Sequence, residues 1–249
     1  IEQLADFAAR RQLKRILVVT DRRLQEAGVV SVLEEQLAKA PLEFSIFDGG
    51  IAEPSLQTAS QALAMAQQWQ PDSVLGLGGG SNMDLAKCVA TIYTHGGSPE
   101  DYFGFDNVPG PVLPIVCVPT TAGTGSEVSH SAVLTDTDNE MKISMLSNFL
   151  RPVVAVVDPQ LTLSCPPKVT ADSGIDALVH AIEAYTARDF DKMEESLGYE
   201  GRFPITDSLA QEAIQLIGSN LVTAFKEPAN LEARENMALA ATLAGMAFS

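Results

Sequence analysis

Short apolar runs alternate with segments of helical periodicity along residues 1–160. The runs are nearly continuous, which is typical of strands that are covered on both faces. Between them, residues 24–40 and 54–70 place apolar side chains at helical spacing and polar ones elsewhere. This alternation predicts a doubly wound, mostly parallel α/β domain. The expected strands are 15–21, 43–49, 73–80, 113–121 and 153–159.

A more polar stretch, residues 127–146, alternates about the turn-forming sequence DTDN and predicts a β-hairpin laid over the sheet. Beyond residue 160 the pattern changes, because no convincing strand remains there. Helical periodicity predicts helices at 172–187, 205–225 and 230–248.

The first two of these helices are separated by a charged stretch, residues 188–204, which contains glycine and proline. Such a composition indicates a surface loop. The change of pattern predicts two domains, an α/β domain over residues 1–160 and an all-helical domain over residues 161–249.

Composition narrows the possible function classes. The chain is 46% apolar and 19% charged, which is typical of a globular protein. It has 32 acidic and 16 basic residues, and the resulting net charge of −16 repels phosphate backbones and anionic lipid surfaces. We therefore expect neither nucleic acid nor membranes as partners. No apolar run approaches the length of a membrane span, and residues 1–15 predict an amphipathic helix rather than a signal peptide.

The cysteines indicate a reducing compartment. The chain has an odd number of cysteines, namely Cys88, Cys117 and Cys165, and they lie far apart in the sequence. The first two lie in apolar contexts that are typical of buried thiols. We therefore expect a soluble, cytoplasmic protein.

A glycine-rich loop joins the third expected strand directly to a helix through Gly78, Gly79 and Gly80, followed by Ser81. Glycines allow a close approach of the main chain, so that peptide N–H groups and a helix N-terminus can face an anion. The sequence is neither the common G-x-G-x-x-G fingerprint nor a P-loop. It predicts a pyrophosphate cradle, and a strand-to-helix turn without a ligand is the alternative.

A second candidate loop, residues 119–127, follows another expected strand and is rich in small hydroxyl side chains. Ligands bind outside the carboxyl ends of the strands of an open α/β sheet. Two such loops at the same edge favour a binding crevice.

Asp21 ends the first expected strand. A carboxylate there can accept a hydrogen bond from a ribose 2′-hydroxyl and repels a 2′-phosphate, which favours NAD over NADP. Asp21 could instead cap a helix, and the neighbouring Arg22 and Arg23 could bind a phosphate.

Asp176 and His180 are four residues apart in an expected helix and therefore share one face. A carboxylate with an imidazole suits Fe²⁺, Zn²⁺ or Mn²⁺. Taken alone the pair is weak evidence, since it can also form a simple hydrogen bond.

The motifs GGGSNMDLAK, PTTAGTGSE, VVDPQLT, GIDALVHAIEAY and AGMAFS occur in this order along nearly the whole chain. In sequence and spacing they resemble the iron-containing (type III) alcohol dehydrogenase family. The resemblance implies a dehydroquinate synthase-like fold, with an NAD-binding α/β domain at residues 1–160. Residues 161–249 would be the N-terminal part of a helical metal-binding domain. A homo-oligomer, namely a dimer, is also expected.

The resemblance also implies roles for particular residues. Asp21 would bind the ribose, and Gly78, Gly79, Gly80 and Ser81 would hold the pyrophosphate. Thr120, Thr121 and Thr124 would lie along the cofactor, and Lys142 would reach it and assist catalysis electrostatically. Asp176 and His180 would be the first two metal ligands.

The other two ligands of the family are histidines that follow the motif AGMAFS, at which this chain ends. We therefore expect those ligands beyond Ser249, and a sequence cut at both ends. His95 and His130 do not occupy ligand positions and are expected to be a loop histidine and a hairpin histidine.

The expected activity is reversible, metal-dependent hydride transfer between an alcohol and NAD, with NADP and Zn²⁺ as alternatives to NAD and Fe²⁺. The substrate would be a small-molecule alcohol or aldehyde. The long loop 188–206 resembles the branch of the family that includes hydroxyacid-oxoacid transhydrogenases, and this activity is an alternative. A non-catalytic nucleotide-binding module is the alternative from another class.

Overall fold

The computed structural model describes residues 1–192 and 201–249. By its contacts the chain divides into two compact units. An α/β unit comprises residues 1–119 and 130–156, and a helical unit comprises residues 120–129 and 157–249. The assignment of 1–160 and 161–249 to two domains of distinct function remains a prediction.

A parallel sheet forms the centre of the α/β unit and contains five strands in the described part of the chain, in the order β2-β1-β3-β5-β8. Every residue of the interior strands β3 and β5 is buried, as their continuous apolar runs predict. The bounds are β1 Arg15–Val19, β2 Glu43–Phe47, β3 Ser73–Gly78, β5 Ile115–Pro119 and β8 Val154–Ala155.

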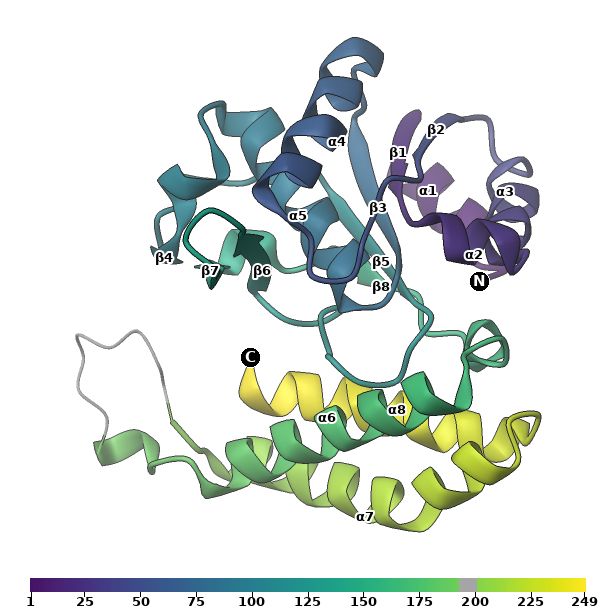
Figure 1. The fold of residues 1–249 in the computed structure, drawn as a ribbon, viewed down its shortest axis with the longest axis vertical. Coiled ribbons are helices and arrows are strands. Elements are labelled where there is room, and N and C mark those ends of the chain that lie inside the picture. The colour runs from purple at the N-terminus through teal and green to yellow at the C-terminus, as the bar shows by residue number, and fades with distance from the viewer. Residues whose placement is uncertain (193–200) are drawn as a thin grey trace. The chain divides into compact units, whose positions relative to one another are not determined.

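Helices cover both faces of this sheet, which confirms the doubly wound α/β prediction. Helices α4 (Leu56–Trp69) and α5 (Gly80–His95) lie on one side of the strands, and α1 (Leu4–Arg10), α2 (Arg22–Glu26) and α3 (Val29–Leu37) lie on the other (Figure 1).

One expected helix is divided in the structure. The prediction of a single helix over residues 24–40 was wrong, because the chain turns at Gly28, whose φ of 77° separates α2 from α3. Glycine adopts this left-handed conformation without the steric cost of a Cβ.

The predicted hairpin is confirmed. Strands β6 (Ser131–Asp136) and β7 (Met141–Leu146) pair antiparallel, and the short strand β4 (Gly104–Phe105) adds to β7. The hairpin packs against α5 and α4, which themselves cover the sheet, rather than lying directly on the sheet. Asp136 shapes the turn by accepting the main-chain N–H groups of Asp138 and Asn139 at 3.0 and 3.1 Å.

The hairpin is attached to α5 by polar contacts. Lys87 is fully buried, and its Nζ donates to the carbonyl oxygen of Ser131 at 2.8 Å. Asp84 accepts the main-chain N–H of Val133 at 3.0 Å. A buried ammonium group is tolerated only with such partners.

The helical unit contains α6 (Pro167–Thr186), α7 (Pro204–Lys226) and α8 (Leu231–Phe248). The three predicted helices are confirmed, but α6 begins five residues before the expected position 172. Proline at the first helical position is compatible with this earlier start, because its missing N–H is not needed there. Short 3₁₀ segments lie at Pro99–Tyr102, Asn148–Leu150, Pro159–Thr162 and Phe190–Lys192. The remainder of the predicted loop, residues 193–200, lies outside the described residues.

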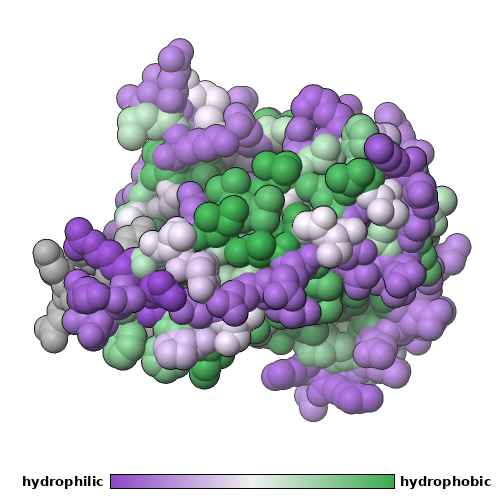
Figure 2. Space-filling model, turned by 90° about the horizontal axis from the view of Figure 1, so that it is seen from below, coloured by the Kyte–Doolittle hydropathy of each residue, from purple (hydrophilic) through white to green (hydrophobic). Residues whose placement is uncertain are grey.

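Small side chains let these helices approach closely. Most of the buried residues between them are alanines, and a Cβ on Gly174 of α6 would lie 2.3 Å from Leu221 of α7. On the outside, large apolar side chains remain exposed, among them Ile182, Ile205, Val222 and Leu239. Figure 2 shows apolar side chains gathered on one face and bordered by hydrophilic ones.

The packing of α5 on β3 gives a first prediction. A Cβ on Gly76 of β3 would lie 2.8 Å from the Cα of Met83, which is main chain and cannot rotate away. Gly76→Val should therefore lower the free energy of unfolding by about 1–3 kcal/mol, measured by urea denaturation. Gly218→Ala in α7 is the control, since nothing lies within 4 Å of its Cβ position. That change should raise stability by about 0.5–1 kcal/mol. Equal effects of the two changes would contradict the packing argument.

Candidate functional site

The strand order of the sheet defines where a ligand can bind. From β1 the chain crosses to β2 at one edge, and from β3 it crosses to β5 in the opposite direction. The adjacent carboxyl ends of β1 and β3 are therefore a topological switch point, where open α/β sheets bind their ligands. Asp21 follows β1, and the glycine loop follows β3.

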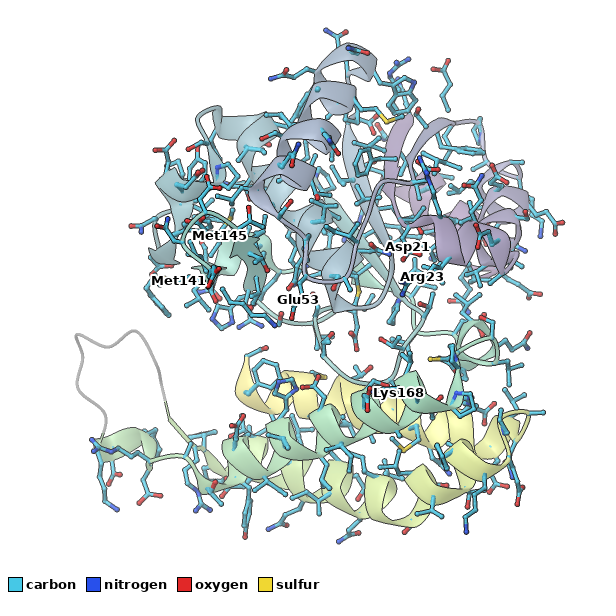
Figure 3. All side chains as sticks on the ribbon, in the orientation of Figure 1. Asp21, Arg23, Glu53, Met141, Met145 and Lys168 are labelled. Atoms are coloured by element: carbon cyan, nitrogen blue, oxygen red, sulfur yellow. The ribbon has the colours of Figure 1, made fainter. Side chains whose placement is uncertain are left out.

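Asp21 is held by several donors. Its Oδ1 accepts the main-chain N–H groups of Arg23 and Leu24 at 2.9 and 3.2 Å, so Asp21 is the N-cap of α2. Its Oδ2 accepts from Nδ2 of Asn82 at 2.7 Å. The helix-cap alternative is therefore present, and it fixes the carboxylate at the switch point without excluding a ligand, because each carboxylate oxygen can accept more than one bond. Figure 3 labels Asp21 and Arg23.

The glycine loop ends in an uncapped helix. Gly78 has a φ of 144°, Gly79 is the N-cap of α5 and Gly80 is its first residue. Among the described residues no side chain caps this N-terminus. The first N–H groups of a helix have no partners within it, so this 16-residue helix offers them to an anion.

Lys142 is connected to this loop through Glu53. Lys142 Nζ lies 2.8 Å from Glu53 Oε1, and the main-chain N–H of Glu53 donates to Ser81 Oγ at 3.3 Å. Both side chains of the ion pair are 61% exposed, and an exposed pair of this kind contributes little stability. The structure thus brings Lys142 together with Ser81, whereas a catalytic role for Lys142 stays a prediction.

In the helical unit, the segment 120–129 is held by two close glycine contacts. A Cβ on Gly123 would lie 2.7 Å from Ser173 of α6, and one on Gly125 would lie 2.4 Å from the Cα of Gly245 in α8. Glu127 is buried, and its Oε1 accepts from the Thr242 hydroxyl at 2.9 Å. The candidate cofactor residues Thr120, Thr121 and Thr124 all lie on this anchored segment, where the hydroxyl of Thr124 also accepts the N–H of Ser126.

Asp176 and His180 share one face of α6, as predicted. Asp176 Oδ1 lies 3.9 Å from His180 Nε2, and the side chains are 44% and 27% exposed. Two ligands bound to one ion at about 2.0–2.2 Å each can be this far apart. The centroids of the His180 and Phe248 rings are 4.7 Å apart. The Nδ1 atom of His180 is buried without a partner among the described residues.

The donor set, a carboxylate oxygen of Asp176 and the imidazole Nε2 of His180, therefore fits a divalent metal. Within residues 1–192 and 201–249 there is no group of three or more His, Cys, Asp or Glu side chains that could hold one. This pair would accordingly supply part of a coordination shell.

The other histidines lie elsewhere. His95 is the last residue of α5 rather than a loop residue, and its Nε2 pairs with the Gly110 carbonyl oxygen at 3.1 Å. His130 precedes β6 and lies edge-on to Phe105. Neither is close enough to further ligands to form a metal site in the described part of the chain.

Sequence reasoning missed several polar residues at these places, namely Asn82, Glu53 and Glu127. Asn82 lies within the quoted glycine motif, and Glu127 ends the motif PTTAGTGSE, so both had a weak signal. Glu53 had none, because its contacts with Ser81 and Lys142 join segments far apart in the sequence.

The fold and these sites define the class of protein: a doubly wound α/β unit with an open helix N-terminus at its switch point, and a helical unit with a metal-compatible pair. Sequence models of two families match, "iron-containing alcohol dehydrogenase" over residues 1–159 and "Fe-containing alcohol dehydrogenase family, C-terminal" over residues 170–249. The chain belongs to the iron-containing alcohol dehydrogenase family, as its motifs predicted.

Individual relatives agree with this assignment. The chain is 36% identical to the NAD-dependent methanol dehydrogenase of Bacillus methanolicus, over 95% of this chain and 59% of that protein. A crystal structure of 1,3-propanediol oxidoreductase superposes with a TM-score of 0.91 at 38% identity, over 99% of this chain and 62% of that one. For sulfoacetaldehyde reductase from Bifidobacterium kashiwanohense in complex with NAD⁺, the TM-score is 0.85 at 33% identity, with the same coverage. The chain thus spans about three fifths of the length of these relatives.

His130 gives a prediction about pH. Burial, followed by the positive charges of Arg151 and Lys87, holds the pKa of His130 below its ordinary value, although Asp106 opposes this. As the pH falls, His130 is therefore protonated in the unfolded chain before it is protonated in the folded one. The stabilising contribution of neutral His130 is present above pH about 6.5 and is lost as the pH falls below that value.

His130→Gln should therefore reduce the loss of unfolding free energy between about pH 7.5 and about pH 5.5. Urea denaturation of both proteins at the two pH values measures this loss. An identical loss in parent and variant would show that His130 does not contribute to the pH dependence.

Proposed function

We propose that this chain is the cofactor-binding and metal-ligating part of an NAD-dependent alcohol dehydrogenase. The reaction is reversible: an alcohol and NAD⁺ give an aldehyde or ketone, NADH and a proton. The observation that carries the proposal is the uncapped N-terminus of α5 behind the glycine loop, at the switch point and beside Asp21, in a member of this family.

In this proposal the α/β part, residues 1–160, binds the dinucleotide. Main-chain N–H groups of Gly79, Gly80 and Ser81 hold the pyrophosphate, since a helix N-terminus stabilises negative charge. Asp21 accepts from the ribose 2′-hydroxyl, which favours NAD over NADP. Thr120, Thr121 and Thr124 line the cofactor. Lys142, which pairs with Glu53, would reach the cofactor on the side of Ser81.

The helical part, residues 161–249, contributes metal ligands. Asp176 and His180 would hold the ion, which is iron by the family assignment, with Zn²⁺ as the alternative. A divalent metal supplies Lewis acidity towards an alcohol or carbonyl oxygen, and the nicotinamide accepts or donates the hydride. Phe248 packs on the His180 ring and fixes its plane, which keeps the imidazole on the face that it shares with Asp176.

The substrate is proposed to be a small alcohol or the corresponding aldehyde. The names of the three relatives span methanol, 1,3-propanediol and sulfoacetaldehyde, so the choice within this class differs between relatives. The transhydrogenase alternative depends on the loop 188–206, of which residues 193–200 lie outside the described residues, and no observation favours it.

The proposal also covers location and assembly. Cys88, Cys117 and Cys165 are reduced thiols, and the first two are buried, which suits a reducing cytoplasm. No helix in the described residues is long and apolar enough to span a membrane. The proposed assembly is a homodimer.

Gly79→Val tests the cofactor site. A branched side chain at the N-cap of α5 should block the approach of the pyrophosphate and weaken NAD binding by at least about tenfold. Isothermal titration calorimetry with NAD⁺ measures the affinity, and Gly218→Ala serves as a control outside the site. Unchanged affinity in a folded Gly79→Val protein would remove the loop from the proposal.

His180→Ala and Asp176→Ala test the metal site in the protein at its natural full length. Each variant should lose the bound metal and the dehydrogenase activity, because a catalytic metal needs about three or four protein ligands. NAD affinity should stay within about twofold, since a binding site that a variant does not touch is largely independent of it. Elemental analysis, NADH absorbance and calorimetry provide the readouts. Full metal content in His180→Ala would show that this pair is only part of a packed helix.

A further inference from the structure

Asn82 connects the two sides of the switch point. The side chain is 2% exposed, and its Nδ2 donates to Asp21 Oδ2 at 2.7 Å and to the Leu77 carbonyl oxygen at 3.1 Å. Both partners can only accept, so the amide must direct its nitrogen towards them. The two donor hydrogens of Asn82 therefore join the end of β1 to the end of β3.

Two glycines provide the space for this side chain. A Cβ on Gly78 would lie 2.2 Å from Asn82 Nδ2, and a Cβ on Gly50 would lie 2.3 Å from Asn82 Oδ1. Gly50 is itself fixed, since its N–H donates to the Thr20 carbonyl oxygen at 2.9 Å. The amide thus has little freedom to rotate, and it presents a fixed donor to Asp21.

The contact completes the set of donors around the Asp21 carboxylate. The N–H groups of Arg23 and Leu24 donate to Oδ1, and among the described residues only Asn82 donates to Oδ2. Without Asn82, the carboxylate would keep only its two hydrogen bonds at Oδ1, and Oδ2 could move about that oxygen. Because hydrogen bonds to a charged acceptor are stronger than neutral ones, the loss of this bond should change the carboxylate position.

Two buried polar atoms at this place have no partner among the described residues. They are Asn82 Oδ1 and Thr20 Oγ1, on side chains that are 2% and 0% exposed. Buried polar groups are normally paired, so unsatisfied ones beside a binding edge indicate a missing ligand group or ordered water. This observation is independent of the Asn82–Asp21 bond.

We propose that Asn82 is a positioning residue that fixes the Asp21 carboxylate and thereby sets the discrimination between NAD and NADP. The proposal rests on the proposed function, because it requires that Asp21 faces the adenosine ribose. A fixed carboxylate accepts from the 2′-hydroxyl of NAD and repels the 2′-phosphate of NADP. A mobile carboxylate accepts from the 2′-hydroxyl less well and repels the 2′-phosphate less strongly.

The test compares two variants. Asn82→Leu keeps the approximate size of the side chain but has no donor, and Asn82→Ala removes the amide. Dissociation constants for NAD⁺ and NADP⁺ are measured by calorimetry. Each variant should lower the ratio of the NADP⁺ constant to the NAD⁺ constant by about tenfold, the effect expected for one hydrogen bond to a charged group. Asn220→Ala, which removes an amide bonded to the Leu216 carbonyl oxygen in α7, is the matched control and should leave the ratio unchanged.

A double-mutant cycle separates positioning from general damage to the fold. In an Asp21→Ala background, Asn82→Ala should change the ratio by less than about twofold, since residues that act through one another are not additive. An unchanged ratio in folded Asn82→Ala, or the same change in both backgrounds, would overturn the inference while leaving NAD binding intact. A parent chain that binds neither dinucleotide would refute the proposed function and the inference with it. If Asn82→Ala does not fold, Asn82→Leu carries the same comparison.

Discussion

The close packing of α5 on β3 is the contact on which the α/β unit depends. With no side chain on Gly76, the main chain of α5 at Met83 comes within van der Waals distance of the strand. This approach brings the helix N-terminus directly to the carboxyl end of β3, where the glycine loop makes the turn. Farther along, α5 presents Asp84 and Lys87 to the hairpin. One helix thus aligns the candidate anion site and anchors the second layer of strands.

The sequence was sufficient for the features that depend on local pattern. Nearly continuous apolar runs located β1, β3 and β5, because strands covered on both faces need apolar residues at most positions. The β-hairpin and the helices of the helical unit followed from periodicity in the same way. Where a single residue changes the backbone, the pattern failed: apolar spacing continues across Gly28, but its positive φ ends one helix and starts another.

The candidate site was predictable only in part, for a similar reason. Asp21, the glycine loop and the pair of Asp176 and His180 are visible because each belongs to a short motif. Asn82 lies in the glycine motif, but its role is not visible there, and Glu53 belongs to no motif. Their roles come from partners 61 and 28 residues away. Burial also matters: Asn82 is polar but 2% exposed, and no sequence pattern states which polar residue will be enclosed by two glycines.

The charge of the chain shapes how the proposed cofactor can be bound. A dinucleotide carries a negatively charged pyrophosphate, and the net charge of −16 opposes its approach. Attraction must therefore come from nearby groups, since charges farther than a Debye length of about 8 Å are largely screened at physiological salt. The N–H groups at the start of α5 act at hydrogen-bond distance and need no counter-charge on a side chain. Lys142 is paired with Glu53, so its net field is small, and Arg22 lies 3.5 Å from Asp48. Main-chain donors, rather than the overall field, therefore have to hold the pyrophosphate. The acidic surroundings then work in the same direction as Asp21, because they disfavour the additional 2′-phosphate of NADP.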